Sequence, residues 1–133
     1  MRIDGQCHCG AIAFEAEVDP ASMSICHCTD CQTLSGSPFR ATIRAPAESF
    51  RLTRGTPTTY VKTAESGNRR RQAFCGTCGT PLYTSDLENT ATYGLRAGTI
   101  TQRAAFTPQK QIWHRSALPW VDAIADASIS EKA

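Results

Sequence analysis

The sequence predicts a mainly β domain that is built from several short antiparallel strands and contains little helix. Segments that alternate between apolar and polar residues recur at intervals of roughly 8–12 residues, with Gly and Pro between them. Helical periodicity is weak throughout, and the sequence contains no repeat, linker or low-complexity tract. A chain of 133 residues is long enough for one modest core, so we expect a single domain over residues 1–133.

The first predicted strand follows Cys7 and Cys9. Residues 11–18 place four apolar side chains on one face and Glu15 and Glu17 on the other, and Asp19-Pro20 ends the segment. The apolar face consists of Ile12, Phe14, Ala16 and Val18. Residues 39–44 alternate in the same way after a loop signal at residues 35–38. Further short strands are predicted at residues 50–52, 58–62, 70–74, 81–84, 92–95 and 109–115. The helical candidates are a short turn after Cys28 and a tail helix near residues 120–127.

Composition and charge argue against several classes of partner. The hydrophobic content of 41% and the charged content of 20% are ordinary for a globular protein. The formal net charge of +2 becomes −1 if seven cysteines bind two Zn²⁺ ions as thiolates, because seven negative charges then meet four positive ones. We therefore expect no nucleic-acid partner. No apolar run approaches the roughly 20 residues that a membrane helix needs, so we also expect no membrane partner.

The N-terminal sequence indicates a cytoplasmic protein. It lacks the apolar stretch of a secretory signal and reaches Cys7 almost at once. In a reducing compartment, clustered cysteines are more often metal ligands than disulfides. The odd number of cysteines and the close Cys-x-Cys pairs also disfavour disulfide bonds.

Seven cysteines fall into three clusters whose spacing suits tetrahedral zinc. The first and third clusters together offer four thiolates, which predicts a closed structural site. Its ligands are Cys7, Cys9, Cys75 and Cys78. Gly76 and Gly79 fit a tight turn that aims N–H groups at sulfur. Because 65 residues separate the first pair from the second, this zinc would tie distant parts of the sheet together and contribute to folding.

The second cluster offers only three thiolates, from Cys26, Cys28 and Cys31. Three protein ligands leave one position for water, hydroxide or a substrate thiolate, as in catalytic zinc sites. Either His8 or His114 could close the site instead, and the plainest alternative is three reduced cysteines that bind metal loosely or not at all. Three anionic ligands make the zinc a weaker Lewis acid than an all-histidine site would. This favours exchangeable thiol binding over hydrolysis.

Other polar residues near the clusters have two interpretations each. If Cys26 and Cys28 bind the same metal ion, the His27 side chain between them points away from that ion. It then has two possible roles, to donate a supporting hydrogen bond or to relay a proton. The arginines at positions 40, 44 and 69–71 are able to pair with a substrate carboxylate. The default for such arginines is a solvated surface.

Several short motifs occur in a fixed order along the chain. They are Gly5-x-Cys7-x-Cys9-Gly10, Cys26-His27-Cys28-x-x-Cys31, Ser35-Gly36-Ser37, Phe74-Cys75-x-x-Cys78-Gly79-Thr80-Pro81-Leu82, Ala97-Gly98-Thr99-Ile100, Pro108 and Ile112-Trp113 with Ser116 and Pro119-Trp120. Together they closely resemble the glutathione-dependent formaldehyde-activating enzyme family, whose domain also occurs in centromere protein V. The resemblance spans about residues 5–122.

The resemblance implies a β-tent fold that carries two zinc ions per chain. It places a structural zinc on the four cysteines of the first and third clusters, and a second zinc, whose occupancy can be partial, on the three cysteines of the second cluster. It also implies the formation of S-(hydroxymethyl)glutathione from glutathione and formaldehyde. In that chemistry the second zinc would hold the thiolate beside the carbonyl.

Two functions follow as expectations. The favoured one is a zinc-dependent carbon–sulfur lyase-type enzyme that handles adducts between a small thiol such as glutathione and a small aldehyde. In this interpretation Cys26, Cys28 and Cys31 carry the catalytic metal. The alternative is a non-catalytic zinc module that binds glutathione or another thiol as a carrier or sensor. A nucleic-acid-binding zinc module is disfavoured, because those modules combine repeated zinc sites with a basic reading helix.

Overall fold

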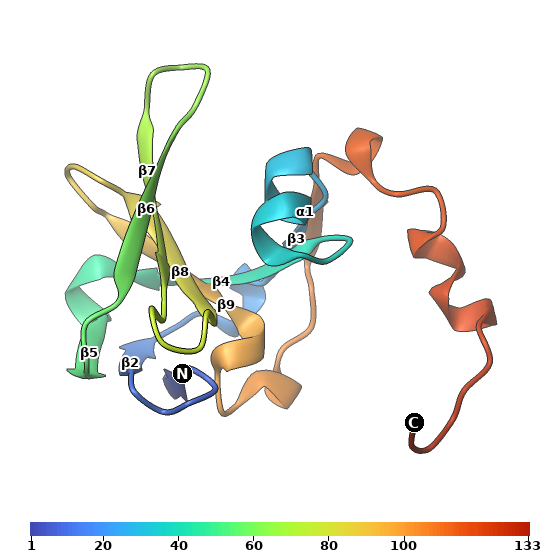
Figure 1. Ribbon diagram of the computed structural model, residues 1–133, viewed down its shortest axis with the longest axis horizontal. Coiled ribbons are helices and arrows are strands. Elements are labelled where there is room, and N and C mark those ends of the chain that lie inside the picture. Colours follow the sequence, from blue (N-terminus) through green and yellow to red (C-terminus); the bar gives the residue numbers. More distant parts are fainter.

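Two sheets make up most of the computed structural model, which describes residues 1–133 (Figure 1). The smaller sheet has the strand order β1-β2-β5, and the larger has the order β10-β3-β4-β9-β8-β7-β6. All neighbouring strands are antiparallel except β10 and β3. The strands are β1 (Arg2–Gln6), β2 (Ala13–Glu17), β3 (Ser24–Cys26), β4 (Arg40–Pro46), β5 (Arg51–Arg54), β6 (Thr58–Thr63), β7 (Arg69–Phe74), β8 (Pro81–Asp86), β9 (Thr92–Arg96) and β10 (Lys110–Ile112).

Helix is scarce, which confirms the predicted fold class. The one α-helix is α1 (Thr29–Ser35), at the position of the turn expected after Cys28, and it lies beside β3 (Figure 1). Short 3₁₀ turns occupy Pro20–Ser22, Ala47–Ser49, Ala97–Thr99, Arg103–Ala105 and His114–Ser116. The expected tail helix is a 3₁₀ segment at Val121–Asp126, within a C-terminal stretch that extends away from the sheets (Figure 1). None of the helices combines the length and the apolar character that crossing a bilayer requires.

Three strands depart from the sequence-based expectation. The strands β1 and β3 were not predicted, because β1 contains only one large apolar residue, Ile3, and β3 is three residues long. Both form by pairing with stronger strands, β1 with β2 and β3 with β4. The strand predicted at residues 109–115 ends at Ile112, because Trp113 adopts a left-handed conformation with φ of 54°.

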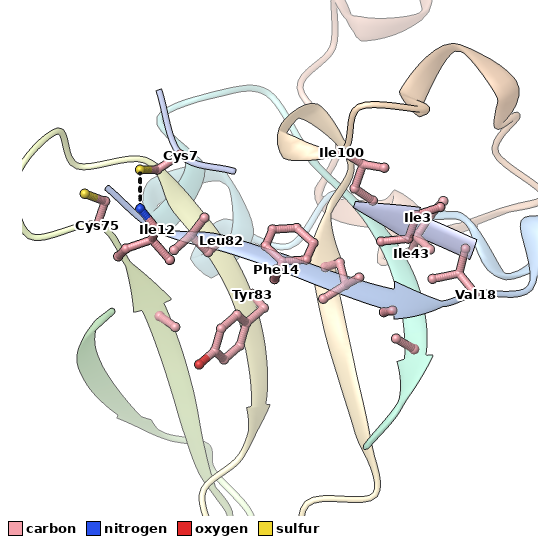
Figure 2. Packing of buried hydrophobic residues seen from close by; sticks show 14 of the residues in the cluster. Ile3, Cys7, Ile12, Phe14, Val18, Ile43, Cys75, Leu82, Tyr83 and Ile100 are labelled. Atoms are coloured by element: carbon pink, nitrogen blue, oxygen red, sulfur yellow. Dashed lines mark hydrogen bonds between the residues drawn. The ribbon is translucent and has the colours of Figure 1, made fainter. Parts of the chain in front are cut away.

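The core lies where the small sheet packs on the large one. The predicted apolar face of β2 and its flanks is buried, and Phe14 occupies the middle of the cluster in Figure 2. Ile43 of β4 and Leu95 of β9 are also fully buried in it. Cys7 and Cys75 lie at one end of this cluster, beside Ile12 and Leu82 (Figure 2). Two of the predicted zinc ligands are therefore part of the core.

Gly5 shows how closely β1 approaches this core. A Cβ atom at this position would lie 2.4 Å from the ring of Phe14 and 2.7 Å from the carbonyl oxygen of Thr99. Neither neighbour has room to move, since the ring is buried and the carbonyl belongs to the backbone. A glycine in β1 is therefore required by packing, although glycine weakens an isolated strand.

We predict that Phe14→Ala lowers the free energy of unfolding by about 3–5 kcal/mol, because it removes a fully buried ring and leaves a cavity. Urea unfolding of the metal-loaded protein, followed by circular dichroism, measures this change. The control is Trp120→Ala, whose side chain is 53% exposed, and which should change stability by less than about 0.5 kcal/mol. Equal destabilisation by the two substitutions would contradict the packing described here.

Candidate metal centres

Four cysteines that are distant in sequence converge at one end of the core. The sulfur atoms of Cys7, Cys9, Cys75 and Cys78 all lie within 4.8 Å of one another. The Sγ atom of Cys9 lies 3.7 Å from that of Cys7 and 3.8 Å from that of Cys75. Four thiolates held tetrahedrally at 2.3 Å from zinc would lie about 3.8 Å apart. The spacing therefore fits a tetrahedral ion, and all seven cysteines of the chain are free thiols.

Backbone N–H groups support the sulfur atoms of this first centre. The amide of Ile12 donates to Cys7 Sγ at 3.3 Å (Figure 2), and the amide of Cys78 donates to Cys75 Sγ at 3.5 Å. The turn that carries the second pair closes through the Cys75 amide and the Thr80 carbonyl, and Gly79 supplies the left-handed residue that this turn needs. The predicted tight turn is confirmed.

Thr80 links the two halves of the first centre. Its hydroxyl oxygen accepts a hydrogen bond from the backbone amide of His8 at 3.1 Å and lies 3.2 Å from Cys78 Sγ. The hydrogen bond from this hydroxyl, with help from backbone amides, lowers the pKa of the Cys78 thiol to about 5. An exposed sulfur that is already a thiolate at neutral pH is ready to bind a cation. Sequence reasoning had assigned no role to Thr80 beyond its place in a motif.

The second centre is built where β3 meets α1. Cys26 ends β3, Cys28 caps the N-terminus of α1, and Cys31 lies in the first turn, where its amide donates to Cys28 Sγ at 3.3 Å. The three sulfur atoms lie within 4.8 Å of one another. Burial raises the pKa of the Cys31 thiol to about 12, and the nearby Arg40 cation only partly opposes this. A bound metal ion would supply the charge that holds such a thiol deprotonated.

No histidine or carboxylate completes the second centre. The ligand atoms of His, Asp and Glu residues all lie outside the group of three sulfur atoms. The buried ring of His27 is held instead by Gln111, whose side-chain oxygen lies 2.7 Å from its Nε2 atom. The ring of His114 packs edge-on against His27 with 5.3 Å between centroids, and His8 belongs to the segment of the first centre. A metal ion bound to these three sulfur atoms would therefore take no fourth ligand from a His, Asp or Glu side chain.

Two glutamines that belong to no recognisable motif support this second centre. Gln32, on α1, donates from its side-chain nitrogen to the carbonyl oxygens of His27 at 2.8 Å and Ser116 at 3.0 Å. Gln111, on β10, holds the ring of His27. The contact between Gln32 and Ser116 and the contact between His27 and Gln111 each join residues 84 positions apart. Only the folded topology brings these partners together, so no local pattern could have revealed them.

The candidate arginines divide into a surface group and a site group. Arg69 pairs with Glu88, and Arg70 lies 2.7 Å from the carboxylate of Asp86. Arg71 donates to the Ser85 hydroxyl, and the side chain at position 44 is exposed. Arg44 and Arg69 are exposed, as the default of a solvated surface predicts, whereas Arg70 and Arg71 are half-buried and contact β8 residues. Position 40 differs, because Arg40 lies directly opposite Cys26 in the β3–β4 register.

Comparison with known proteins finds a family model and a curated relative that are similar to this chain. The family model of the glutathione-dependent formaldehyde-activating enzyme matches residues 2–116. A Schizosaccharomyces pombe protein named as an uncharacterized lyase is 32% identical over 80 residues, which cover 60% of this chain and 55% of that protein. The chain thus spans about half the length of this curated relative.

A solved structure shares the fold. The crystal structure of a Rhodobacter sphaeroides protein superposes with a TM-score of 0.63 and 22% sequence identity, and the match covers 81% of this chain and 98% of that one. The family match extends over most of the sequence, including all seven cysteines of the two centres. The chain belongs to the glutathione-dependent formaldehyde-activating enzyme family.

Proposed function

We propose that this protein is a zinc-dependent carbon–sulfur lyase-type enzyme that acts on adducts between a small thiol and a small aldehyde. S-(hydroxymethyl)glutathione, formed from glutathione and formaldehyde, is the example that the family suggests. The observation that carries the proposal is the incomplete set of three sulfur atoms at the second centre. A fully coordinated ion has no position for a substrate, whereas three protein ligands leave one.

The two centres have different roles in this proposal. Cys7, Cys9, Cys75 and Cys78 hold a structural zinc, and three catalytic ligands hold the second zinc. Those catalytic ligands are Cys26, Cys28 and Cys31. We assign both zinc ions to one domain, residues 1–133, and the protein to a reducing compartment such as the cytoplasm, where all seven thiols stay available to metal.

The chemistry needs a thiolate close to a carbonyl carbon. When bound, zinc would lower the pKa of a substrate thiol and so supply a thiolate at neutral pH. The sulfur forms a bond to the carbonyl carbon, the C=O π electrons move to oxygen, and that oxygen takes up a proton. The reverse reaction breaks the same carbon–sulfur bond. The three cysteines would position the ion, because β3 and α1 hold their sulfur atoms within 4.8 Å of one another.

We predict that the zinc-loaded protein accelerates S-hydroxymethyl adduct formation between glutathione and formaldehyde above the uncatalysed rate. Exchange NMR at several thiol concentrations measures both rates under one set of conditions. Rates equal to the uncatalysed reaction at every concentration would rule out the enzyme. Saturable binding of glutathione without such acceleration would instead identify a thiol carrier or sensor.

Substitution of one cysteine in each centre should separate their roles. We predict that Cys75→Ser prevents folding or solubility, because it opens the site that lies at the end of the core. Cys28→Ser should give a folded protein with about one zinc per chain and no catalytic acceleration. Circular dichroism and metal analysis of both purified variants test this difference. Equal unfolding of the two variants would contradict the division between a structural and a catalytic centre.

A further inference from the structure

A row of polar side chains extends from the second metal centre across the large sheet. Strand register places Cys26 opposite Arg40, and Thr42 opposite Arg96. Directly paired residues, and residues two apart on one strand, lie on the same face of a sheet. The row continues through Gly94, Thr84, Gln72 and Tyr60, which pair in sequence across β9, β8, β7 and β6. Its members alternate along the strands with core residues such as Ile43 and Leu95.

Two cavities open over this row, and both are lined by the same pair of arginines. Each has a volume of about 370 Å³, and Arg40, Pro81 and Arg96 line both of them. One cavity reaches Leu34 on α1, the helix that carries Cys31. Arg40 connects this space to the second metal centre, because it lines both cavities and lies opposite Cys26 in the strand register.

Arg96 is buried but has unused hydrogen-bonding capacity. Its side chain is 8% exposed, and only its Nη2 atom donates, to the Thr84 hydroxyl at 2.8 Å and to the Gly94 carbonyl at 3.0 Å. Its Nε and Nη1 atoms are buried without a partner. The guanidinium lies close to Gly94, where a Cβ atom would come within 3.0 Å of both Thr42 Cγ2 and the Thr84 hydroxyl that accepts from Nη2.

No acidic side chain of the protein neutralises this pair. The ion pairs of the chain include neither Arg40 nor Arg96. Arg40 donates instead to the neutral side chain of Gln72 at 3.0 Å. Burial, together with the charge of Arg40, lowers the pKa of Arg96 to about 9, which is still above neutral pH. A buried cation without a counter-charge is unfavourable, which indicates that an anion belongs here.

The second metal centre accounts for only part of this positive charge. With its fourth position free of a thiolate, a centre of three thiolates around one Zn²⁺ would carry a net charge of −1, whereas the two guanidinium groups carry +2. One positive charge is left, which suits a singly charged carboxylate better than a doubly charged phosphate. The planar guanidinium also matches the two oxygen atoms of a carboxylate.

We propose that Arg40 and Arg96 form a carboxylate-binding subsite beside the second metal centre. Assigning that carboxylate to the thiol substrate rests on the proposed function, whereas carboxylate binding by the arginines does not. The pair would determine specificity by selecting thiols that also carry a carboxylate and by aiming their sulfur at the open position.

Isothermal titration of the zinc-loaded protein with S-methylglutathione tests this subsite without any aldehyde or turnover. The methylated sulfur cannot bind as a thiolate, so the carboxylates dominate recognition. We expect at least tenfold tighter binding than for the dimethyl ester of the same probe, as the loss of charge-assisted hydrogen bonds implies. Comparable affinity for acid and ester, or no measurable binding of the acid, would overturn the proposal.

Single substitutions test whether Arg40 and Arg96 bind the carboxylate of S-methylglutathione. Arg40→Gln should weaken binding of S-methylglutathione about tenfold and leave binding of the ester almost unchanged. Arg40 is only partly buried, so this variant should fold even if Arg96→Gln does not. Arg44→Gln is the matched control, since Arg44 is exposed on the same strand and lines neither cavity. Equal effects of Arg40→Gln and Arg44→Gln would refute the subsite. Carboxylate-dependent binding by a protein that shows no catalysis would support the subsite and refute only the proposed reaction.

Discussion

The convergence of four sulfur atoms at one end of the core is the constraint on which the rest of the structure depends. Cys7 follows β1 in the small sheet, and Cys75 follows β7 in the large one, so the first centre joins the two sheets. Both residues are also fully buried among apolar side chains. An ion held there would couple metal binding directly to core formation. The three-sulfur centre lies elsewhere on the large sheet, at the β3–α1 junction, and its cysteines are not part of the core cluster.

The large sheet serves two purposes through its two faces. Residues such as Ile43 and Leu95 pack towards β2 and bury the apolar surface that stabilises the domain. The residues that alternate with them lie on the opposite face. They include Arg40 and Arg96, which line the cavities beside α1. Because side chains alternate along every strand, the register that fills the core also fixes the spacing between the arginines and Cys26. Stability and the geometry of the site are set by the same strand pairings.

Sequence reasoning succeeds here where the signal is local. The alternation around Phe14 predicts β2 and its buried face, and the short cysteine spacings predict which sulfur atoms gather at each centre. It fails where structure depends on distant pairing. The strand β3 is too short to show a pattern, and Arg96 looks like any polar residue at the end of a strand. Its burial arises only when Thr84 and Gly94 are placed around it by β8 and β9. The ion pairs of Arg69 and Arg70 likewise form with acids of another segment, because Asp86 ends β8 and Glu88 follows it.

Zinc K-edge X-ray absorption on the freshly purified protein, with a metal count on the same sample, tests the two-centre assignment most directly. A closed centre with four sulfur ligands and an open centre with three give two zinc ions per chain and an average of about 3.5 sulfur atoms per zinc at about 2.3 Å, completed by a lighter atom. An average of four sulfur atoms per zinc in a sample that carries two zinc ions per chain would contradict the assignment of an open position to Cys26, Cys28 and Cys31.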